Sequence, residues 1–132
     1  MTGTDKLEAP APGVLPPFTQ ASMEAYLAVS GDVNPLHVEP DLAERLGLDG
    51  LPVPGMLVMA AIANYLAQWP RCRTTKRLGA RFTTPVYVDS ELAISARIVR
   101  HPSNDQPNPV FRVVVTQNAK IAVFAEAELE LA

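Results

Sequence analysis

The chain has 132 residues, of which 48% are hydrophobic, a length and composition typical of one globular domain. Its formal net charge of -3 argues against a general nucleic-acid-binding protein, because such proteins need a basic surface to displace counterions from phosphates. The single cysteine, Cys72, cannot form an internal disulfide, so we expect a reducing, cytoplasmic location.

The N-terminal segment, residues 1–17, is rich in proline and predicts a flexible lead-in to a single domain that spans residues 18–132. Proline lacks the N–H that a sheet ladder requires, so only a short extended piece is expected, around Val14 and Leu15. The segment is charged and lacks an apolar run, which argues against a signal peptide.

The first helix is expected to begin after Thr19, a favourable N-cap residue. Phe18 and Met23 flank this cap at the two positions of a hydrophobic staple. The helix should end near Ser30 and Gly31.

An irregular turn is expected over residues 32–37, because Pro35 disfavours a helical conformation at the residue before it. A short helix over residues 41–46 should follow, with Gly47 after it as a stop.

The second main helix is predicted over residues 55–69, where the sequence carries no charged residue. A helix that is apolar on nearly all sides should be buried on nearly all sides. Prolines at positions 52, 54 and 70 limit it to roughly 15 residues, whereas a membrane span needs about 20, so no membrane association is expected.

The rest of the chain is strand-like, with period-two alternation that suits an antiparallel sheet exposed on one face. The sequence indicates strands over residues 81–87, interrupted by Pro85, and over 92–99, 111–116 and 125–131. A sheet wrapped around the apolar helix would bury that helix, which predicts the α+β class.

Asp32 and His37 are the candidate catalytic residues, since they flank the Pro35 turn and precede the uncharged helix start at Gly55. An acid, a base and a helix N-terminus with free N–H groups are what an acyl-transfer or hydration site needs. On the residues alone, the simpler interpretation is that Asp32 caps the turn and His37 forms a local hydrogen bond.

The run Tyr26-Leu-Ala-Val-Ser-Gly-Asp-Val-Asn-Pro-Leu-His37, followed by the small residue Ala43, resembles the signature of the MaoC-like, (R)-specific enoyl-CoA hydratases. Two further stretches extend the likeness: the Gly55-Met56-Leu57 run, and the phenylalanine, Pro-Val and Asp/Glu pattern within residues 81–92. The resemblance covers about residues 18–132.

This resemblance implies a hot-dog fold, in which a long antiparallel sheet wraps the helix at 55–69. It also implies a homodimer or paired hot-dog subunits, with the substrate tunnel at their interface. The substrate would be a trans-2-enoyl thioester of coenzyme A or acyl carrier protein, and the product the (R)-3-hydroxyacyl thioester, or the reverse. No metal or redox cofactor is implied.

The same resemblance assigns roles to individual residues. Asp32 and His37 would hold and activate one water molecule. The Gly55 N–H would bind the thioester oxygen, with Met56 beside it in the substrate site. Asn34 would support the turn or orient the catalytic pair.

A basic cluster follows the central helix and offers contacts for phosphates of coenzyme A or for an acidic carrier protein. Its members are Arg71, Arg73, Lys76, Arg77 and Arg81. The plainer interpretation is a solvated loop and strand start. Cys72 lies between two of these arginines, which would favour its thiolate, but no base stands beside it for catalysis.

Two departures from the family pattern leave alternatives open. Many relatives have histidine where this chain has Pro54, and some have serine where it has Ala63, with Asn64 beside it. A non-catalytic acyl-thioester-binding subunit, a dehydratase subunit for carrier-protein substrates and a thioesterase are the alternatives, because fold alone does not fix function. Acyl chain length, reaction direction and partner identity stay open.

Overall fold

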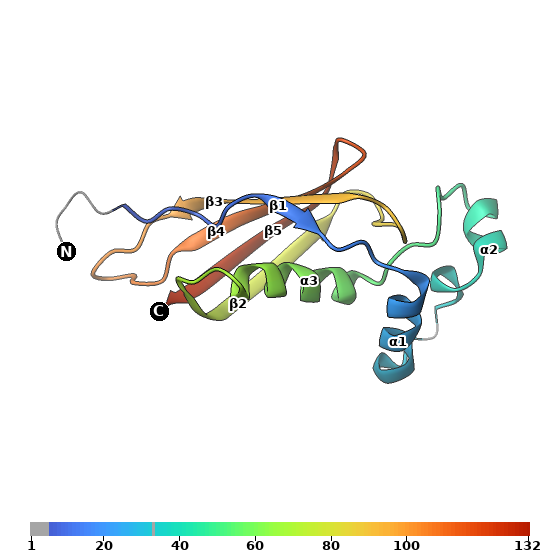
Figure 1. Cartoon of the computed structure of the whole chain (residues 1–132), viewed down its shortest axis with the longest axis horizontal. Coiled ribbons are helices and arrows are strands. Elements are labelled where there is room, and N and C mark those ends of the chain that lie inside the picture. The colour runs from blue at the N-terminus through green and yellow to red at the C-terminus, as the bar shows by residue number, and fades with distance from the viewer. Residues whose placement is uncertain (1–5, 33) are drawn as a thin grey trace.

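A computed structural model describes residues 6–32 and 34–132 and contains a five-stranded antiparallel sheet alongside one long helix (Figure 1). The strand order is β1-β3-β4-β5-β2, so β1 and β2 form the two edges of the sheet. The elements are β1 (Gly13–Leu15), α1 (Gln20–Ser30), a 3-10 turn (Pro35–His37), α2 (Pro40–Arg45), α3 (Gly55–Ala67), β2 (Cys72–Phe82), β3 (Leu92–Arg100), β4 (Val110–Gln117) and β5 (Lys120–Leu131). The predicted α+β class is confirmed.

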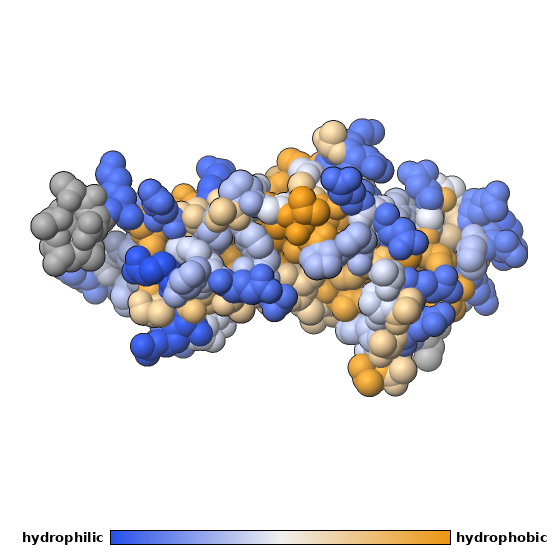
Figure 2. All heavy atoms as spheres, viewed as in Figure 1, coloured by the Kyte–Doolittle hydropathy of each residue, from blue (hydrophilic) through white to orange (hydrophobic). Residues whose placement is uncertain are grey.

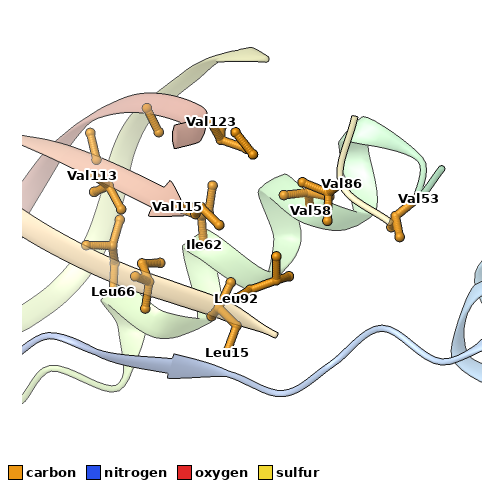
Figure 3. Packing of buried hydrophobic residues seen from close by; sticks show 14 of the residues in the cluster. Leu15, Val53, Val58, Ile62, Leu66, Val86, Leu92, Val113, Val115 and Val123 are labelled. Carbon is orange, nitrogen blue, oxygen red and sulfur yellow. The ribbon is translucent and has the colours of Figure 1, made fainter. Parts of the chain in front are cut away.

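The core lies between α3 and the inner face of the sheet. Val58, Ile62 and Leu66 recur every four residues along α3, so they form one stripe, and all three are fully buried. Figure 3 shows them facing strand residues that include Val113 and Val115. Burying this stripe against β-branched side chains is what holds the helix on the sheet.

The prediction that α3 is buried on nearly all sides is wrong for the single chain. Its opposite side is open: the Met56 side chain is 64% exposed, and Ala60, Asn64 and Ala67 are exposed as well. The absence of charge therefore marks a helix with a second, mostly apolar face that the described residues of this chain do not cover. The helix also ends at Ala67, two residues before the predicted Trp69.

The described part of the proline-rich N-terminal segment belongs to the domain. The extended piece expected at Val14 and Leu15 is confirmed as β1, which pairs antiparallel with β3 and buries Leu15. The Tyr65 hydroxyl donates a hydrogen bond to the Ala11 carbonyl at 2.7 Å. The domain thus includes residues that the sequence assigned to a flexible lead-in, whereas residues 1–5 lie outside the described residues.

The predicted strand over residues 81–87 is wrong in its position. The strand that follows α3 is β2, which runs from Cys72 to Phe82, and residues 83–87 continue as a loop. Register shifts between Cys72 and Thr74 and between Thr75 and Arg77 break the period-two pattern, so the sequence does not show it. Strands β3 and β4 lie where predicted, whereas β5 begins at Lys120, five residues before the predicted start at 125. Asn118 and Ala119 form the tight turn between β4 and β5 with positive φ angles.

Helices α1 and α2 project beyond the end of the sheet and frame the segment that holds Asp32 and His37 (Figure 1). The predicted cap of α1 is confirmed: the Thr19 hydroxyl accepts from the Ser22 N–H, and the Ser22 hydroxyl accepts from the Thr19 N–H, both at 3.0 Å. In the space-filling view, hydrophobic residues gather over the middle of the molecule, where β1 and α3 lie (Figure 2). Within the described residues, no helix is both long enough and apolar enough to cross a membrane.

Candidate active site

The turn that carries the candidate catalytic residues is built by short-range hydrogen bonds. Gly31 ends α1 with a positive φ of 74°, which turns the chain out of the helix. The Asp32 carboxylate accepts from the Asn34 N–H at 3.0 Å through Oδ1, and the Asn34 side chain accepts from the Leu36 N–H at 3.1 Å. Asn34 therefore supports the turn, and Asp32 keeps its second oxygen free.

The Asp32 and His37 side chains face each other across this turn. His37 Nε2 lies 3.4 Å from Asp32 Oδ2, with the His37 side chain 12% exposed and that of Asp32 34% exposed. His37 Nδ1 lies 2.8 Å from the Pro52 carbonyl oxygen. A carbonyl oxygen can only accept, so Nδ1 carries the proton of this bond. In the neutral ring Nε2 is then a lone-pair acceptor that faces a carboxylate.

The Pro52 carbonyl is itself held in place by the segment 86–88. Val53 donates to the Val86 carbonyl at 2.7 Å, and Val88 donates to the Leu51 carbonyl at 3.0 Å. The two segments thus pair like short antiparallel strands on either side of Pro52. This pairing fixes the position of the oxygen that orients His37.

A buried glutamine holds the second of these segments. Gln117 accepts from the Tyr87 N–H at 2.9 Å and donates to the Pro85 carbonyl at 3.0 Å. Its side chain is buried, with the residue only 6% exposed. Sequence reasoning missed Gln117, although it continues the inward alternation of Phe111, Val113 and Val115 and is the polar member of that series.

The N-terminus of α3 begins three residues after Pro52. The N–H groups of Leu57 and Val58 donate to the Pro54 carbonyl at 3.0 and 3.2 Å. For the N–H groups of Gly55 and Met56, the part of the chain that the structure describes supplies no acceptor. Pro54 accommodates this helix start without a side-chain cap.

Phe82 is a neighbour of this helix start that was not singled out from the sequence. A side chain at position 55 would place its Cβ 3.3 Å from Cε2 and 3.4 Å from Cζ of the Phe82 ring. Phe82 is 38% exposed, so the ring forms part of the surface beside Gly55. Phe82 belongs to the phenylalanine, Pro-Val and Asp/Glu pattern of residues 81–92, which was the signal available in the sequence.

The five residues of the predicted basic cluster do not form one site. Arg77 and Arg81 lie on the outer face of the sheet, where they line an open hollow of about 700 Å³ together with Arg100, Arg112 and two glutamates. Arg73 and Lys76 lie at the two register shifts of β2, and Arg71 precedes the strand. No described hydrogen bond or ion pair connects any of the five with Asp32 or His37.

The expectation that neighbouring arginines favour the Cys72 thiolate is wrong in direction. Burial raises the pKa of the Cys72 thiol, and a hydrogen bond with Thr75 offsets only part of this rise. Cys72 is half-buried and packs against the hydrophobic core, and so we interpret it as a packing residue. Among the described residues, no group of three or more His, Cys, Asp or Glu side chains gathers closely enough to hold a metal ion.

Comparison of the sequence with known proteins gives consistent matches. Residues 8–125 match the family model described as MaoC like domain. The chain is 28% identical over 116 residues to the (R)-specific enoyl-CoA hydratase of Aeromonas caviae, an alignment that covers 86% of this chain and 87% of that protein. It is 33% identical over 113 residues to the fatty acid synthase beta subunit pigK of Monascus ruber, which covers 83% of this chain but only 6% of that protein. It is 33% identical over 76 residues to the mitochondrial 3-hydroxyacyl-[acyl-carrier-protein] dehydratase of Arabidopsis thaliana, which covers 57% of this chain and 45% of that protein.

Comparison with solved structures finds the same kind of protein. The (R)-hydratase from A. caviae superposes with a TM-score of 0.81 at 24% identity, over 98% of this chain and 100% of the other. A chain of the ChsH1-ChsH2 complex from Mycobacterium tuberculosis superposes with a TM-score of 0.76 at 18% identity, over 96% of this chain and 100% of the other. These similarities confirm the predicted hot-dog fold.

Proposed function

The chain belongs to the MaoC-like domain family, and we propose that it catalyses the (R)-specific hydration of a trans-2-enoyl thioester to the (R)-3-hydroxyacyl thioester, together with the reverse dehydration. The observation that carries this proposal is the Asp32–His37 pair, held by the Pro52 carbonyl just before the N-terminus of α3. The chemistry calls on no metal or redox cofactor. Coenzyme A or acyl carrier protein takes part only as the carrier of the acyl group.

Water activation follows from the orientation of the His37 ring. With the Nδ1 proton donated to Pro52, Nε2 and Asp32 Oδ2 both present lone pairs across 3.4 Å. One water molecule can donate one proton to each, which aims its own lone pair at the β-carbon of the substrate. His37 then takes a proton as the hydroxyl bonds to the β-carbon, and the pair returns that proton to the α-carbon on the same face. A positioned acid–base group of this kind accelerates proton transfer by roughly 10²–10⁴-fold.

The negative charge that develops on the thioester oxygen needs hydrogen-bond donors. The N–H groups of Gly55 and Met56 are the available donors, at a helix terminus whose dipole favours negative charge. One such donor contributes about 10²–10³-fold. We assign the Gly55 N–H to the thioester oxygen and place Met56 beside the acyl group.

The hydrogen-bond donors to the Asp32 carboxylate differ from those expected in relatives with serine at the position of Ala63. Alanine has no hydroxyl, and the Asn34 N–H is the donor that the structure gives to Asp32 Oδ1. This bond leaves Oδ2 for the water molecule and His37. The loss of the serine is therefore compatible with catalysis, which favours an enzyme over a non-catalytic acyl-binding subunit.

The choice of carrier is the second part of the proposal. The similar proteins include one named for enoyl-CoA and one named for an acyl-carrier-protein substrate. The reaction is the same on both carriers, because the carrier lies beyond the sulfur. We propose coenzyme A thioesters as the substrate, since the alignment with the enoyl-CoA hydratase covers 86% of this chain and 87% of that protein. A dehydratase subunit for carrier-protein substrates is the alternative.

The test is the loss of enoyl absorbance when the purified chain meets crotonyl-CoA, longer enoyl-CoA and crotonyl carrier protein. We expect hydration to the (R)-product, with a 10²–10⁴-fold lower kcat for Asp32→Asn and for His37→Ala. Asp41→Asn and His101→Ala are matched controls at exposed positions outside the site and should retain full activity.

Two results would contradict the proposal. Full activity of the Asp32→Asn and His37→Ala variants would remove the catalytic pair from the mechanism. Failure to hydrate any of the three substrates would favour an acyl-binding subunit, and release of free thiol would indicate thioester hydrolysis instead.

A further inference from the structure

The loop of residues 85–89, between β2 and β3, makes hydrogen bonds with three parts of the chain that are distant in the sequence. Part of its backbone pairs with residues 51–53, and part binds the side chain of Gln117. At the end of the loop, the Asp89 N–H donates to the Phe18 carbonyl at 2.7 Å. The loop is therefore bonded to the segment before α3, to the core strand β4 and to the start of α1.

The first of these contacts connects the 85–89 loop with His37. The Val53 N–H donates to the Val86 carbonyl at 2.7 Å, and both residues lie beside the start of α3 (Figure 3). His37 Nδ1 lies 2.8 Å from the carbonyl oxygen of Pro52, the residue before Val53. A displaced loop would carry the Pro52 carbonyl with it, because hydrogen bonds on both sides of Pro52 join the two segments. The position of the loop therefore determines whether His37 Nδ1 has an acceptor for its proton.

The bond to Phe18 connects the same loop with Asp32. Phe18 is buried and immediately precedes Thr19, the N-cap residue of α1. At the other end of this helix, the Asp32 N–H donates to the hydroxyl of its last residue, Ser30, at 3.2 Å. A helix transmits the position of its start to its end, because it moves as a rigid element. The loop therefore contacts the supports of both members of the proposed catalytic pair.

Gln117 holds the middle of the loop through both ends of its side-chain amide. Its oxygen accepts from the Tyr87 N–H at 2.9 Å, and its nitrogen donates to the Pro85 carbonyl at 3.0 Å. Both bonds need a neutral side chain that donates and accepts at once. Methionine has a similar length, but it has no N–H donor and its sulfur is only a weak acceptor. Gln117→Met therefore removes the two bonds while most of the side-chain volume stays in the core.

Asp89 holds the end of the loop through its backbone conformation. Its φ angle of 64° lies in the left-handed region, which Asp and Asn tolerate, glycine adopts freely and β-branched residues disfavour strongly. Valine at this exposed position would drive the backbone out of that region and turn the N–H away from Phe18. The neighbouring Val88 N–H, which donates to the Leu51 carbonyl at 3.0 Å, would move as well. Position 89 therefore tests the loop without any change to the core.

We propose that Gln117 and Asp89 are positioning residues of the site, which hold the 85–89 loop so that its bonds keep the His37 proton on Nδ1 and Asp32 facing Nε2. The effect on catalysis rests on the proposed hydration. The place of the His37 proton does not, because it is measured without substrate. Failure of this inference and failure of the proposed function are therefore distinguishable.

The first measurement is heteronuclear NMR of the His37 ring nitrogens, whose shifts report which nitrogen is protonated. The chain has two histidines, so a His101→Ala background leaves the signals of His37 alone. At a pH where the ring is neutral, we expect the Nδ1–H form in this background. Gln117→Met and Asp89→Val should each shift the ring toward the Nε2–H form, because the Pro52 carbonyl is no longer fixed. Asp89→Asn removes the charge but tolerates the same backbone conformation, and it should keep the Nδ1–H form.

The second measurement is kcat for crotonyl-CoA hydration by the same variants. Gln117→Met and Asp89→Val should lower kcat by up to about 100-fold, the effect of misplacing a catalytic group by about 1 Å. Asp89→Asn should stay close to wild type.

Val113→Ala is the control for a merely structural role. Val113 is fully buried on the same inner face of β4 as Gln117, so its truncation weakens the core without removing a bond to the loop. It should lower stability and leave the His37 proton and kcat unchanged. Asp89→Val keeps the test decisive if Gln117→Met folds poorly. The Nδ1–H form retained in the folded loop variants, or the same shift of the proton in Val113→Ala, would overturn the proposal even if the chain hydrates no substrate.

Discussion

The contact between Gly55 and Phe82 allows the packing role of position 55 to be separated from its proposed catalytic role. In Gly55→Ala, the new Cβ lies 3.3 Å from the Phe82 ring, closer than ordinary van der Waals contact. Alanine in a helix gains about 0.5–1 kcal/mol over glycine, whereas overpacking costs about 1–3 kcal/mol. The net expectation is a loss of stability of up to about 2.5 kcal/mol, because the partly exposed ring can move only in part.

In a Phe82→Ala background the ring is absent, so the strain disappears. Gly55→Ala should then stabilise the chain by about 0.5–1 kcal/mol, which gives a coupling energy of about 1–3 kcal/mol between the two positions. Chemical denaturation of the four chains measures this coupling. Equal effects of Gly55→Ala in both backgrounds would show that Phe82 does not constrain position 55.

The same four chains report on catalysis. If the Gly55 N–H binds the thioester oxygen and glycine is needed for its close approach, the double variant should recover stability without recovering kcat. If glycine is present only to accommodate Phe82, stability and activity should recover together. The second outcome would contradict the proposed role of Gly55 as a close-approach residue.

Four further expectations concern stability and reactivity. Thr19→Ala should cost about 1 kcal/mol in thermal unfolding, because the capping box of α1 is lost. Cys72 should react with iodoacetamide at pH 8 more slowly in the folded than in the urea-unfolded chain, since burial raises the pKa of its thiol. Tyr65→Phe should cost about 1 kcal/mol through the bond to Ala11. Burial also raises the pKa of Tyr65, so wild-type stability should be complete below pH about 10 and fall as the pH rises through the raised pKa, a fall absent from the variant. Gln117→Leu should cost about 2–4 kcal/mol in denaturation and lower kcat, because two backbone groups lose their partner; an unchanged kcat would contradict its positioning role.

Caps, glycines and prolines in the sequence were sufficient to predict the helix ends and turns that depend only on neighbouring residues. Helix α1 is set by the cap at Thr19 and the glycine at position 31, and the structure has both. The turn around Pro35 and the hairpin at Asn118 also depend on residues within a few positions of each other. The Asp32–His37 pair belongs to this group, since its members are only five positions apart.

Features that depend on residues distant in the sequence were not predicted. The position of strand β2 was not predicted, because its two register shifts interrupt the period-two pattern. The burial of α3 was overestimated because composition shows that a helix is apolar all round, but not which of its faces meets the sheet. Phe82 and Gln117 act on segments 27 to 32 residues away, which no periodicity in the sequence reports.

The geometry of the proposed catalytic pair, Asp32 and His37, depends on these distant residues as much as on the motif. The Pro52 carbonyl orients His37, the pairing with residues 86–88 fixes Pro52, and Gln117 holds that segment from the end of β4. A His37 ring without the Pro52 acceptor could adopt the other tautomer, and Nε2 would then carry a proton where the proposed water must donate one. Intact Asp32 and His37 are therefore necessary for the proposed hydration but not sufficient for it. The proposed hydration also needs a fixed carbonyl at Pro52 and the N–H donors at the start of α3.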